Sequence, residues 1–283
     1  MFSKLEDTYF KVNKSIRYKD KLIQLERPLM MGIANVTPDS FYAASRTEDI
    51  SSFLKKTEQQ LDDGMDILDI GAYSSRPGAD EVKESDELGR LIPYIEVVSK
   101  EFPDLMISVD TFRSQVAREA VKAGAGIIND ISGFQIDPEI ISVASEFNTP
   151  YILMHMRGTP QTMQQLTNYN NLFNDIYNYF SLKITSLKNA GVNDIILDLG
   201  FGFSKTLEQN FKLLNEIDQF EGLDCPILVG ISRKSMIYKK LGTSPEEALN
   251  GTTILNTLST IKGASILRVH DVREASEIIN LLC

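Results

Sequence analysis

Short apolar runs alternate along the chain with segments of helical periodicity, and glycine marks several of the junctions. Gly64, Gly124, Gly191 and Gly263 lead directly into the runs MDILDI, AGIIND, VNDIILD and ASILRVH. Glycine directly after a helix tolerates the left-handed conformation that ends it. The runs lack a strict alternation of apolar and polar positions, which is typical of parallel strands buried on both faces.

Eight such runs are predicted to be strands, with helical segments between them. They are roughly Met30–Asn35, Ile67–Gly71, Met106–Asp110, Gly126–Asp130, Tyr151–His155, Ile195–Asp198, Pro226–Ser232 and Ser265–His270. Eight alternating strand and helix units in this length favour an α/β fold of the (β/α)8 TIM-barrel type. An open doubly wound sheet has similar units and is the alternative at this point.

Capping residues predict where two of the helices start. Ser244, Pro245 and Glu247 supply a cap, a first-turn proline and a capping-box acid for a helix that runs to Lys262. Residues 206–209, TLEQ, predict a second helix start of the same kind.

The first 27 residues precede the first predicted strand. Their mixed pattern, FKVNKSIRY followed by KLIQLE, predicts a hairpin that closes the lower end of the barrel. Residues 1–27 are therefore expected to be an N-terminal extension, and residues 28–283 a single barrel domain.

Composition narrows the class of protein. A hydrophobic content of 42% in 283 residues suffices for one core of barrel size. The net charge of -10 makes nucleic acid and anionic membranes poor partners. No apolar run reaches membrane-spanning length, and the N-terminus lacks the apolar stretch of a signal peptide. Cys225 and Cys283 have neither metal-ligand nor redox spacing, so we expect a cytoplasmic protein with reduced thiols.

Polar side chains gather at the carboxyl ends of the predicted strands, where barrel active sites lie. The set is Asn35, Asp69, Asp110, Asn129, His155, Asp198, Ser232 with Arg233 and Lys234, and Arg268 with His270. Any one of them alone would be an ordinary loop or capping residue. Together they could recognise a polar heterocycle and an anionic group, which leaves the reaction itself open.

The motifs at these positions resemble those of the dihydropteroate synthase family. GIANVTPDSF, from Gly32, resembles the opening signature of the family, and DIGAYSSRPGA, from Asp69, resembles its second loop. Later matches, in order, are SVDTF, NDISG, MHMRG, DLGFGFSK, GISRKS and RVHD. The resemblance covers about residue 28 to the end, and the order and spacing of TPDSF, SRPGA and SRKS are highly specific.

The resemblance implies a transferase of folate biosynthesis. Such an enzyme joins 6-hydroxymethyl-7,8-dihydropterin diphosphate to p-aminobenzoate, uses Mg²⁺, and commonly forms a homodimer. This chain departs from the usual pattern in three places. Residues 72–75 read AYSS where GEST is common, Leu199 stands where proline usually follows the aspartate, and the first loop reads YAASRTED. Ser75 keeps a hydroxyl group, Leu199 loosens the turn after Asp198, and the altered first loop bears on its closed conformation more than on the chemistry.

Four residues match the family positions that bind the pterin. They are Asp110, Asn129, Asp198 and Lys234. Carboxylate, carboxamide and ammonium groups complement the amide and amino edge of the pterin ring. Burying such groups without a ligand would cost several kcal/mol unless water replaced it, so we expect an open, hydrated pocket in the free protein.

The diphosphate is expected at the last strand. Arg268 and His270 are two residues apart, so they point to the same side, and guanidinium and imidazole groups suit phosphate oxygens. The resemblance places Mg²⁺ on Asn35, whose amide oxygen suits a hard cation that keeps several waters. Ser75 and Arg76, on the second loop, are further diphosphate candidates.

The amine must then attack the carbon that the diphosphate leaves. An arylamine is a weak nucleophile, so early departure of diphosphate is attractive, and a fixed carboxylate would stabilise the resulting cation. Asp110 and Asp69 are the candidates, and Lys234 completes the expected catalytic set. Our hypothesis is that Asp110 acts electrostatically and forms no covalent bond to the pterin.

The p-aminobenzoate carboxylate is expected near Lys234 and Ser235, where a helix opens, because helix N-termini attract anions. The resemblance places five residues around the benzene ring: Phe41, Ser75, Pro77, Gly202 and Phe203. Phe41 and Pro77 belong to two long loops, at about residues 36–48 and 72–83. We expect these loops to close over the bound pterin and to make binding ordered.

Three questions stay open at this level. His155 could line the pocket or simply end the fifth strand, and the structural role is favoured slightly. A pterin-binding methyltransferase, which passes a methyl group from methyl-tetrahydrofolate to a corrinoid partner, would share the aspartate and asparagine positions. A binding protein without catalysis is the third possibility, and the retained Asp110, Lys234, Arg268 and His270 argue against it.

Overall fold

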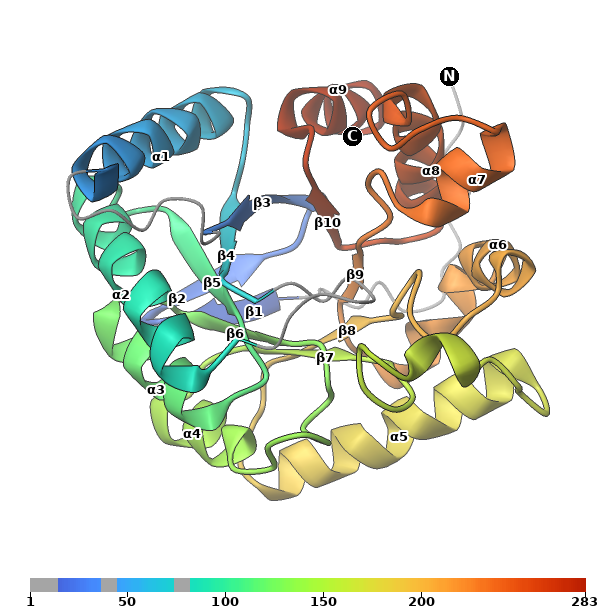
Figure 1. Cartoon of the computed structure of the whole chain (residues 1–283). Helices are drawn as coiled ribbons and strands as arrows, with labels where there is room; N and C mark the ends of the chain where they lie inside the picture. Colours follow the sequence, from blue (N-terminus) through green and yellow to red (C-terminus); the bar gives the residue numbers. More distant parts are fainter. Residues whose placement is uncertain (1–14, 37–44, 74–81) are drawn as a thin grey trace.

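The computed structural model describes residues 15–36, 45–73 and 82–283. Eight parallel strands close into a barrel in the order β10-β3-β4-β5-β6-β7-β8-β9 (Figure 1). They are β3 (Leu29–Asn35), β4 (Ile67–Gly71), β5 (Met106–Asp110), β6 (Ile127–Asp130), β7 (Tyr151–Met154), β8 (Ile195–Asp198), β9 (Ile227–Val229) and β10 (Ile266–Val269). The predicted (β/α)8 barrel is confirmed, and the open-sheet alternative is wrong.

Helices surround this barrel and cover the outer faces of the strands. They are α1 (Ser45–Asp62), α2 (Glu84–Glu101), α3 (Ser114–Ala123), α4 (Ile140–Phe147), α5 (Leu172–Asn189), α6 (Leu207–Asn215), α7 (Ser235–Leu241), α8 (Leu249–Ile261) and α9 (Val272–Leu282), with 3-10 helices at Met163–Gln165 and Ile217–Leu223. The four junction glycines all have positive φ, between 90° and 125°, as predicted. In the described part of the chain no helix is long and apolar enough to cross a membrane.

One predicted helix start is confirmed and the other is wrong. The Thr206 side chain accepts a hydrogen bond from the Gln209 N–H and completes a capping box at the start of α6. By contrast, α8 begins at Leu249 rather than at Pro245, because the carbonyls of Pro245 and Glu246 accept hydrogen bonds from Arg233. A distant guanidinium thus overrides the local capping signal.

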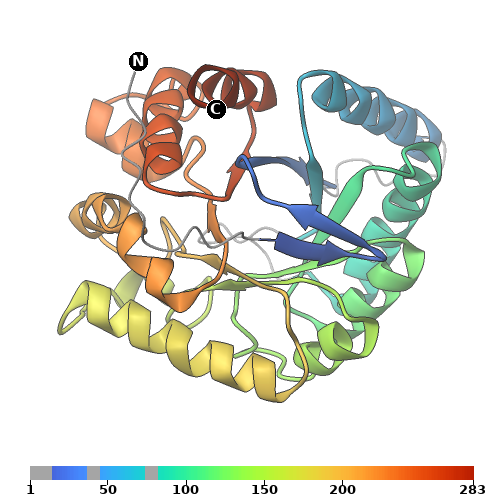
Figure 2. The same ribbon diagram turned by 180° about the vertical axis from the view of Figure 1, so that it is seen from behind.

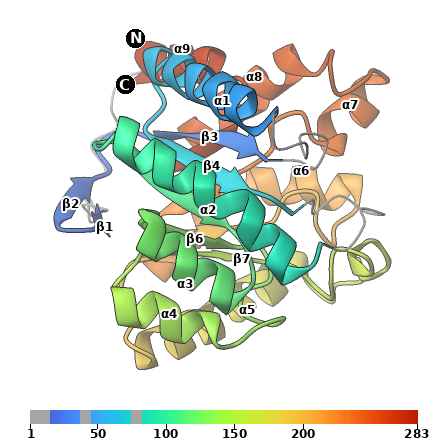
Figure 3. The same cartoon turned by 60° about the vertical axis from the view of Figure 1, so that its left-hand side comes forward.

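The N-terminal hairpin is present and lies across the end of the barrel where the strands begin (Figures 2 and 3). β1 (Ser15–Tyr18) pairs antiparallel with β2 (Lys21–Gln24). The Tyr18 side chain is 5% exposed, and its hydroxyl accepts the Ile107 N–H at 3.0 Å and donates to the Leu105 carbonyl at 3.3 Å. The hairpin therefore closes the lower end of the barrel through a tyrosine bonded to β5.

Candidate active site

Two layers of side chains fill the barrel, one apolar and one polar. The lower layer packs against the hairpin and includes Met31, Ile67, Met106, Ile127, Ile152, Ile196, Leu228 and Ile266. Two residues further along five of these strands stand Asp69, Ser108, Asn129, Asp198 and Arg268. Side chains two apart on a strand share a face, so these polar groups also point into the barrel, toward its carboxyl end. The change from apolar to polar marks the floor of the candidate site.

Arg268 organises the polar layer. Its Nε donates to Asp69 Oδ2 at 2.7 Å, and its Nη2 donates to Asp110 Oδ2 at 2.8 Å. Asp69 is fully buried and also accepts from Ser108 Oγ at 2.6 Å and from Asn129 Nδ2 at 3.0 Å. The structure thus brings four predicted site residues into one hydrogen-bonded cluster, in which Asp69 holds Asn129 and Arg268 in place.

Burial and neighbouring charges shift the pKa values of Asp110 and Arg268. Burial raises the pKa of Asp110 above its ordinary value, while Arg268 opposes that rise. Burial acts to lower the pKa of Arg268, but the charges of Asp69 and Asp110 outweigh this effect and raise the pKa, so the guanidinium stays charged. Arg268 bonds the carboxylates through Nε and Nη2, and within the described residues its Nη1 makes no hydrogen bond, so Nη1 can donate to an anionic ligand.

Asn35 is the last residue of β3 and is exposed. In the strand registers Asn35 pairs with Gly71, and Gly71 in turn pairs with Asp110. A Cβ atom on Gly71 would lie 3.2 Å from the Asp110 Cβ, so glycine leaves room for the Asp110 side chain. The proposed metal ligand and the proposed catalytic carboxylate therefore flank one glycine.

Asp198 and Lys234 lie on the opposite side of the barrel from β4. The Asp198 carboxylate is buried and accepts the Gly200 N–H at 2.8 Å. Lys234 Nζ donates to the Phe201 carbonyl at 2.7 Å and lies 4.8 Å from the centre of the Phe203 ring. Burial lowers the pKa of Lys234 to about 8, although Asp198 acts to raise it.

Gly202 joins the same group. A Cβ atom at this position would lie 3.3 Å from the Lys234 Cδ, and its φ of +85° favours glycine. The structure thus brings Lys234 together with Gly202 and Phe203, two of the residues predicted to surround the benzene ring. Ser235 follows as the first residue of α7.

His270 contacts Ser232 rather than Arg268. The Ser232 Oγ accepts the His270 backbone N–H at 3.2 Å and lies 3.0 Å from its ring Nδ1. Burial, aided by Arg268, lowers the pKa of His270 to about 4, so its imidazole is neutral at neutral pH. A neutral imidazole offers one N–H donor to an anion, not a second positive charge.

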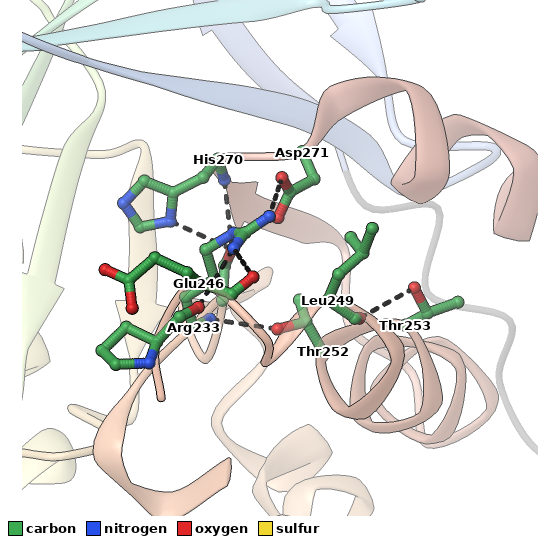
Figure 4. Close-up of polar contacts among 9 residues, drawn as sticks. Arg233, Glu246, Leu249, Thr252, Thr253, His270 and Asp271 are labelled. Carbon is green, nitrogen blue, oxygen red and sulfur yellow. Dashed lines mark hydrogen bonds and ion pairs between the residues drawn. The ribbon is translucent and has the colours of Figure 1, made fainter. Parts of the chain in front are cut away.

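Arg233 is a scaffold for the strand ends that carry Lys234 and His270 (Figure 4). Its φ is +54°, and Nε and Nη2 donate to the two carboxylate oxygens of Asp271, each at 2.8 Å. Its backbone N–H donates to Thr252 Oγ1 at 3.1 Å. The charge of Arg233 is therefore used within the fold, and we do not count it among the site cations.

Four predicted site residues lie outside the described part of the chain: Phe41, Ser75, Arg76 and Pro77. The two-loop closure expected from residues 36–48 and 72–83 therefore stays a prediction. Two other polar residues, Ser108 and Lys205, were missed by the sequence reasoning. Ser108 stands two before Asp110, a spacing that could have revealed it, whereas Lys205 carries no comparable signal.

The fold and the site define a pterin-binding barrel enzyme, and comparison with known proteins agrees. The family model described as pterin binding enzyme matches residues 31–270. A dihydropteroate synthase of Synechocystis sp. is 43% identical over 256 residues, which are 89% of this chain and 88% of that protein. The chain belongs to the dihydropteroate synthase family.

Solved structures agree with this assignment. A Yersinia pestis dihydropteroate synthase in complex with a sulfonamide drug superposes with a TM-score of 0.88 at 38% identity, covering 94% of this chain and 97% of that one. The Xanthomonas albilineans enzyme with 4-aminobenzoic acid gives 0.86 at 33% identity, covering 95% and 97%.

Proposed function

We propose that this chain condenses 6-hydroxymethyl-7,8-dihydropterin diphosphate with p-aminobenzoate. The carbon–oxygen bond to diphosphate breaks, a carbon–nitrogen bond to the arylamine forms, and the amine loses a proton, giving 7,8-dihydropteroate and diphosphate. The observation that carries the proposal is the polar layer itself, in which pterin-matching carboxylate and amide groups stand beside a bridging guanidinium. The binding of 4-aminobenzoic acid by the Xanthomonas relative supports the choice of amine.

In the proposed complex the pterin edge faces Asp198, Asn129 and Lys234. The carboxylate and the amide oxygen accept the ring amide and amino hydrogens, and the ammonium donates to a ring acceptor. Positive charge that develops on the pterin as diphosphate departs is stabilised by Asp110, which Arg268 holds in place. Since only electrostatic stabilisation is required, no covalent bond to Asp110 is needed.

The leaving diphosphate is placed between the end of β3 and the end of β10. Arg268 Nη1 and the His270 ring face it, and a Ser232 hydroxyl that donates to His270 Nδ1 would turn Nε2–H toward the phosphate oxygens. The positive charge of Arg268 and the imidazole donor together favour the charge that accumulates on the departing group.

Mg²⁺ would be held by Asn35 together with diphosphate oxygens and water. Asn35 supplies one exposed neutral oxygen donor, and among the described residues no cluster of three histidine, cysteine or acidic side chains could hold a metal alone. This fits Mg²⁺, which binds with few protein ligands and substrate phosphates. Bound there, it would offset charge on the leaving group.

The Mg²⁺ proposal predicts that metal and diphosphate bind together. Calorimetric titration with Mg²⁺ should give a clear signal only when the pterin diphosphate is present, and Asn35→Ala should raise the Mg²⁺ concentration needed for half-maximal rate. The pterin without its diphosphate should bind equally well with EDTA. Tight Mg²⁺ binding to the free protein would contradict this arrangement.

The function is tested by diphosphate release from the pterin diphosphate with Mg²⁺, with and without p-aminobenzoate. We expect release that is coupled to formation of dihydropteroate. Pterin binding without product would favour a binding protein. Methyl transfer from methyl-tetrahydrofolate to a corrinoid acceptor, with no need for Mg²⁺, would favour the methyltransferase alternative.

We further propose a cytoplasmic homodimer. Neither Cys225 nor Cys283 forms a disulfide bond in the described part of the chain, which fits a reducing compartment. The dimer proposal is supported by α8, which carries no charged residue and leaves Ile254 57% and Ile261 68% exposed. An exposed apolar helix face of this kind suits a second copy of the chain.

A further inference from the structure

The loop after β8, residues 199–205, is held in place by two lysine side chains. Lys234 Nζ donates a hydrogen bond to the Phe201 carbonyl. Lys205 Nζ donates to the carbonyls of Gly200 at 2.9 Å and Phe203 at 3.1 Å. Three residues of the loop have positive φ, at Gly200, Gly202 and Ser204. The lysine ammonium groups thereby satisfy backbone carbonyls of a loop that is largely buried, as buried acceptors require.

Lys205 has one further partner, which is His155. The Lys205 Nζ lies 3.0 Å from His155 Nδ1, and the two residues are only 5% and 2% exposed. Lys205 therefore has three acceptors for the three donors of an ammonium group, if His155 carries its proton on Nε2. Burial lowers the pKa of His155 well below its ordinary value, which keeps the imidazole neutral in this role.

The loop and the end of β7 fit closely at this point. A Cβ atom on Gly200 would lie 2.0 Å from the His155 carbonyl oxygen, so no larger residue fits there without movement. Ser204 adds an uncharged link, since its Oγ accepts the Arg157 N–H and donates to the Arg157 carbonyl, both at 2.9 Å. Lys205 is thus the charged member of two links that fix the loop to the segment that follows β7.

Asp198 begins this loop and is the carboxylate that the proposed function assigns to the pterin. Burial raises its pKa, while Lys234, the Gly200 N–H, Arg268 and Lys205 each lower it. A carboxyl group that became protonated would lose one acceptor oxygen and its charge. Recognition of the pterin donors therefore depends on the groups that keep Asp198 ionised.

We propose that Lys205, held by His155 and by the carbonyls of Gly200 and Phe203, is a positioning residue that presents Asp198 to the pterin as a carboxylate. The inference rests on the proposed function, because it concerns how the pterin is bound. It also gives His155 a role, as the acceptor that completes the site for the Lys205 ammonium.

Lys205 carries its positive charge in the acidic pH range, where Asp198 would become protonated. Burial lowers the pKa of Lys205 to about 7, Asp198 raises it, and Lys234 and Arg157 lower it. Below that pH the ammonium is charged and opposes protonation of Asp198. Above it the neutral amine can still donate to the loop carbonyls.

The test is the pH dependence of pterin binding in Lys205→Met and in its matched control Ser204→Ala. Dissociation constants for 6-hydroxymethylpterin are measured by calorimetry from about pH 5 to pH 8, and Asp198→Asn identifies the part of the profile that Asp198 causes. In Lys205→Met the acidic loss of binding should move to higher pH by roughly half a unit to one unit. Ser204→Ala loosens the same loop without removing charge, so its profile should not move.

Lys205→Gln provides a second neutral variant, which keeps an N–H donor for the loop carbonyls if the methionine variant does not fold. It should show the same upward shift. A Lys205 variant that folds and loses binding at the same pH as the natural protein would overturn the inference. Failure of the natural protein to bind the pterin at any pH would instead count against the proposed function.

Discussion

At the scale of single residues, the proposed mechanism depends most on the negative charge of Asp110. Asn at this position keeps the size of the side chain and removes the charge that faces the developing cation. We expect Asp110→Asn to lower kcat/KM by roughly 100- to 1,000-fold, the range for loss of one preorganised electrostatic group. Steady-state kinetics at saturating Mg²⁺ measures the effect, with circular dichroism as the check on folding.

The same residue tests the proposed course of the reaction. Because burial raises the pKa of Asp110, its carboxylate form is lost as pH falls, and the rate should fall with it. Asp110→Asn should abolish that acid dependence. Mass spectrometry of rapidly quenched reactions should find no pterin attached to Asp110, and a trapped adduct there would defeat the electrostatic mechanism.

Lys234 sets a second pH limit. Its pKa is lowered to about 8, so its ammonium is lost as pH rises through that value, and kcat/KM should fall in the same range. Arginine does not titrate there, so Lys234→Arg should move the alkaline limit upward even if the maximal rate is reduced. Lys239→Arg, at an exposed position on α7, should leave the profile unchanged. An unmoved limit in Lys234→Arg would assign it to another group.

At the scale of elements, the hairpin should contribute stability without contributing to the chemistry. Tyr18→Phe leaves the buried Ile107 N–H without its acceptor, so we expect a loss of about 1–3 kcal/mol in the free energy of unfolding. Urea denaturation measures it. The rate should hardly change, because β1 and β2 lie at the end of the barrel opposite the site.

Lys21→Ala is the matched control on the same hairpin. It removes a salt bridge to Asp104 whose side chains are 69% and 91% exposed, and such pairs contribute little. Equal destabilisation by the two substitutions would mean that the tyrosine hydroxyl is not what attaches β1 to the barrel.

At the scale of the whole molecule, the exposed apolar face of α8 predicts the interface of the proposed homodimer. Ile254→Lys places a charge on this face and should convert the proposed dimer to monomers, as measured by light scattering after gel filtration. Leu182→Lys is the control, since Leu182 is 72% exposed on α5, which covers a different part of the barrel from α8. Dimers that survive Ile254→Lys would place the interface elsewhere.

The sequence by itself determined the barrel. Buried parallel strands give apolar runs, glycine ends the helices before them, and the strands found in the structure match the predicted ones to within a few residues. It also placed Asp110, Asn129, Asp198 and Arg268 at one end of the barrel, because each stands near the carboxyl end of a parallel strand.

Only the tertiary structure decided which of these groups bond to one another. Arg268 bonds to Asp69, 199 residues away in the sequence, and to Asp110, 158 residues away. Closure of the barrel brings β10 beside β3, and the Arg268 side chain then reaches across the interior. Likewise, the hydrogen bonds of Arg233 determine where α8 begins, and Lys205 contacts His155 from a different strand end. Local sequence records the preference of each segment, whereas the partner of a buried charge depends on where the closed barrel places every other strand.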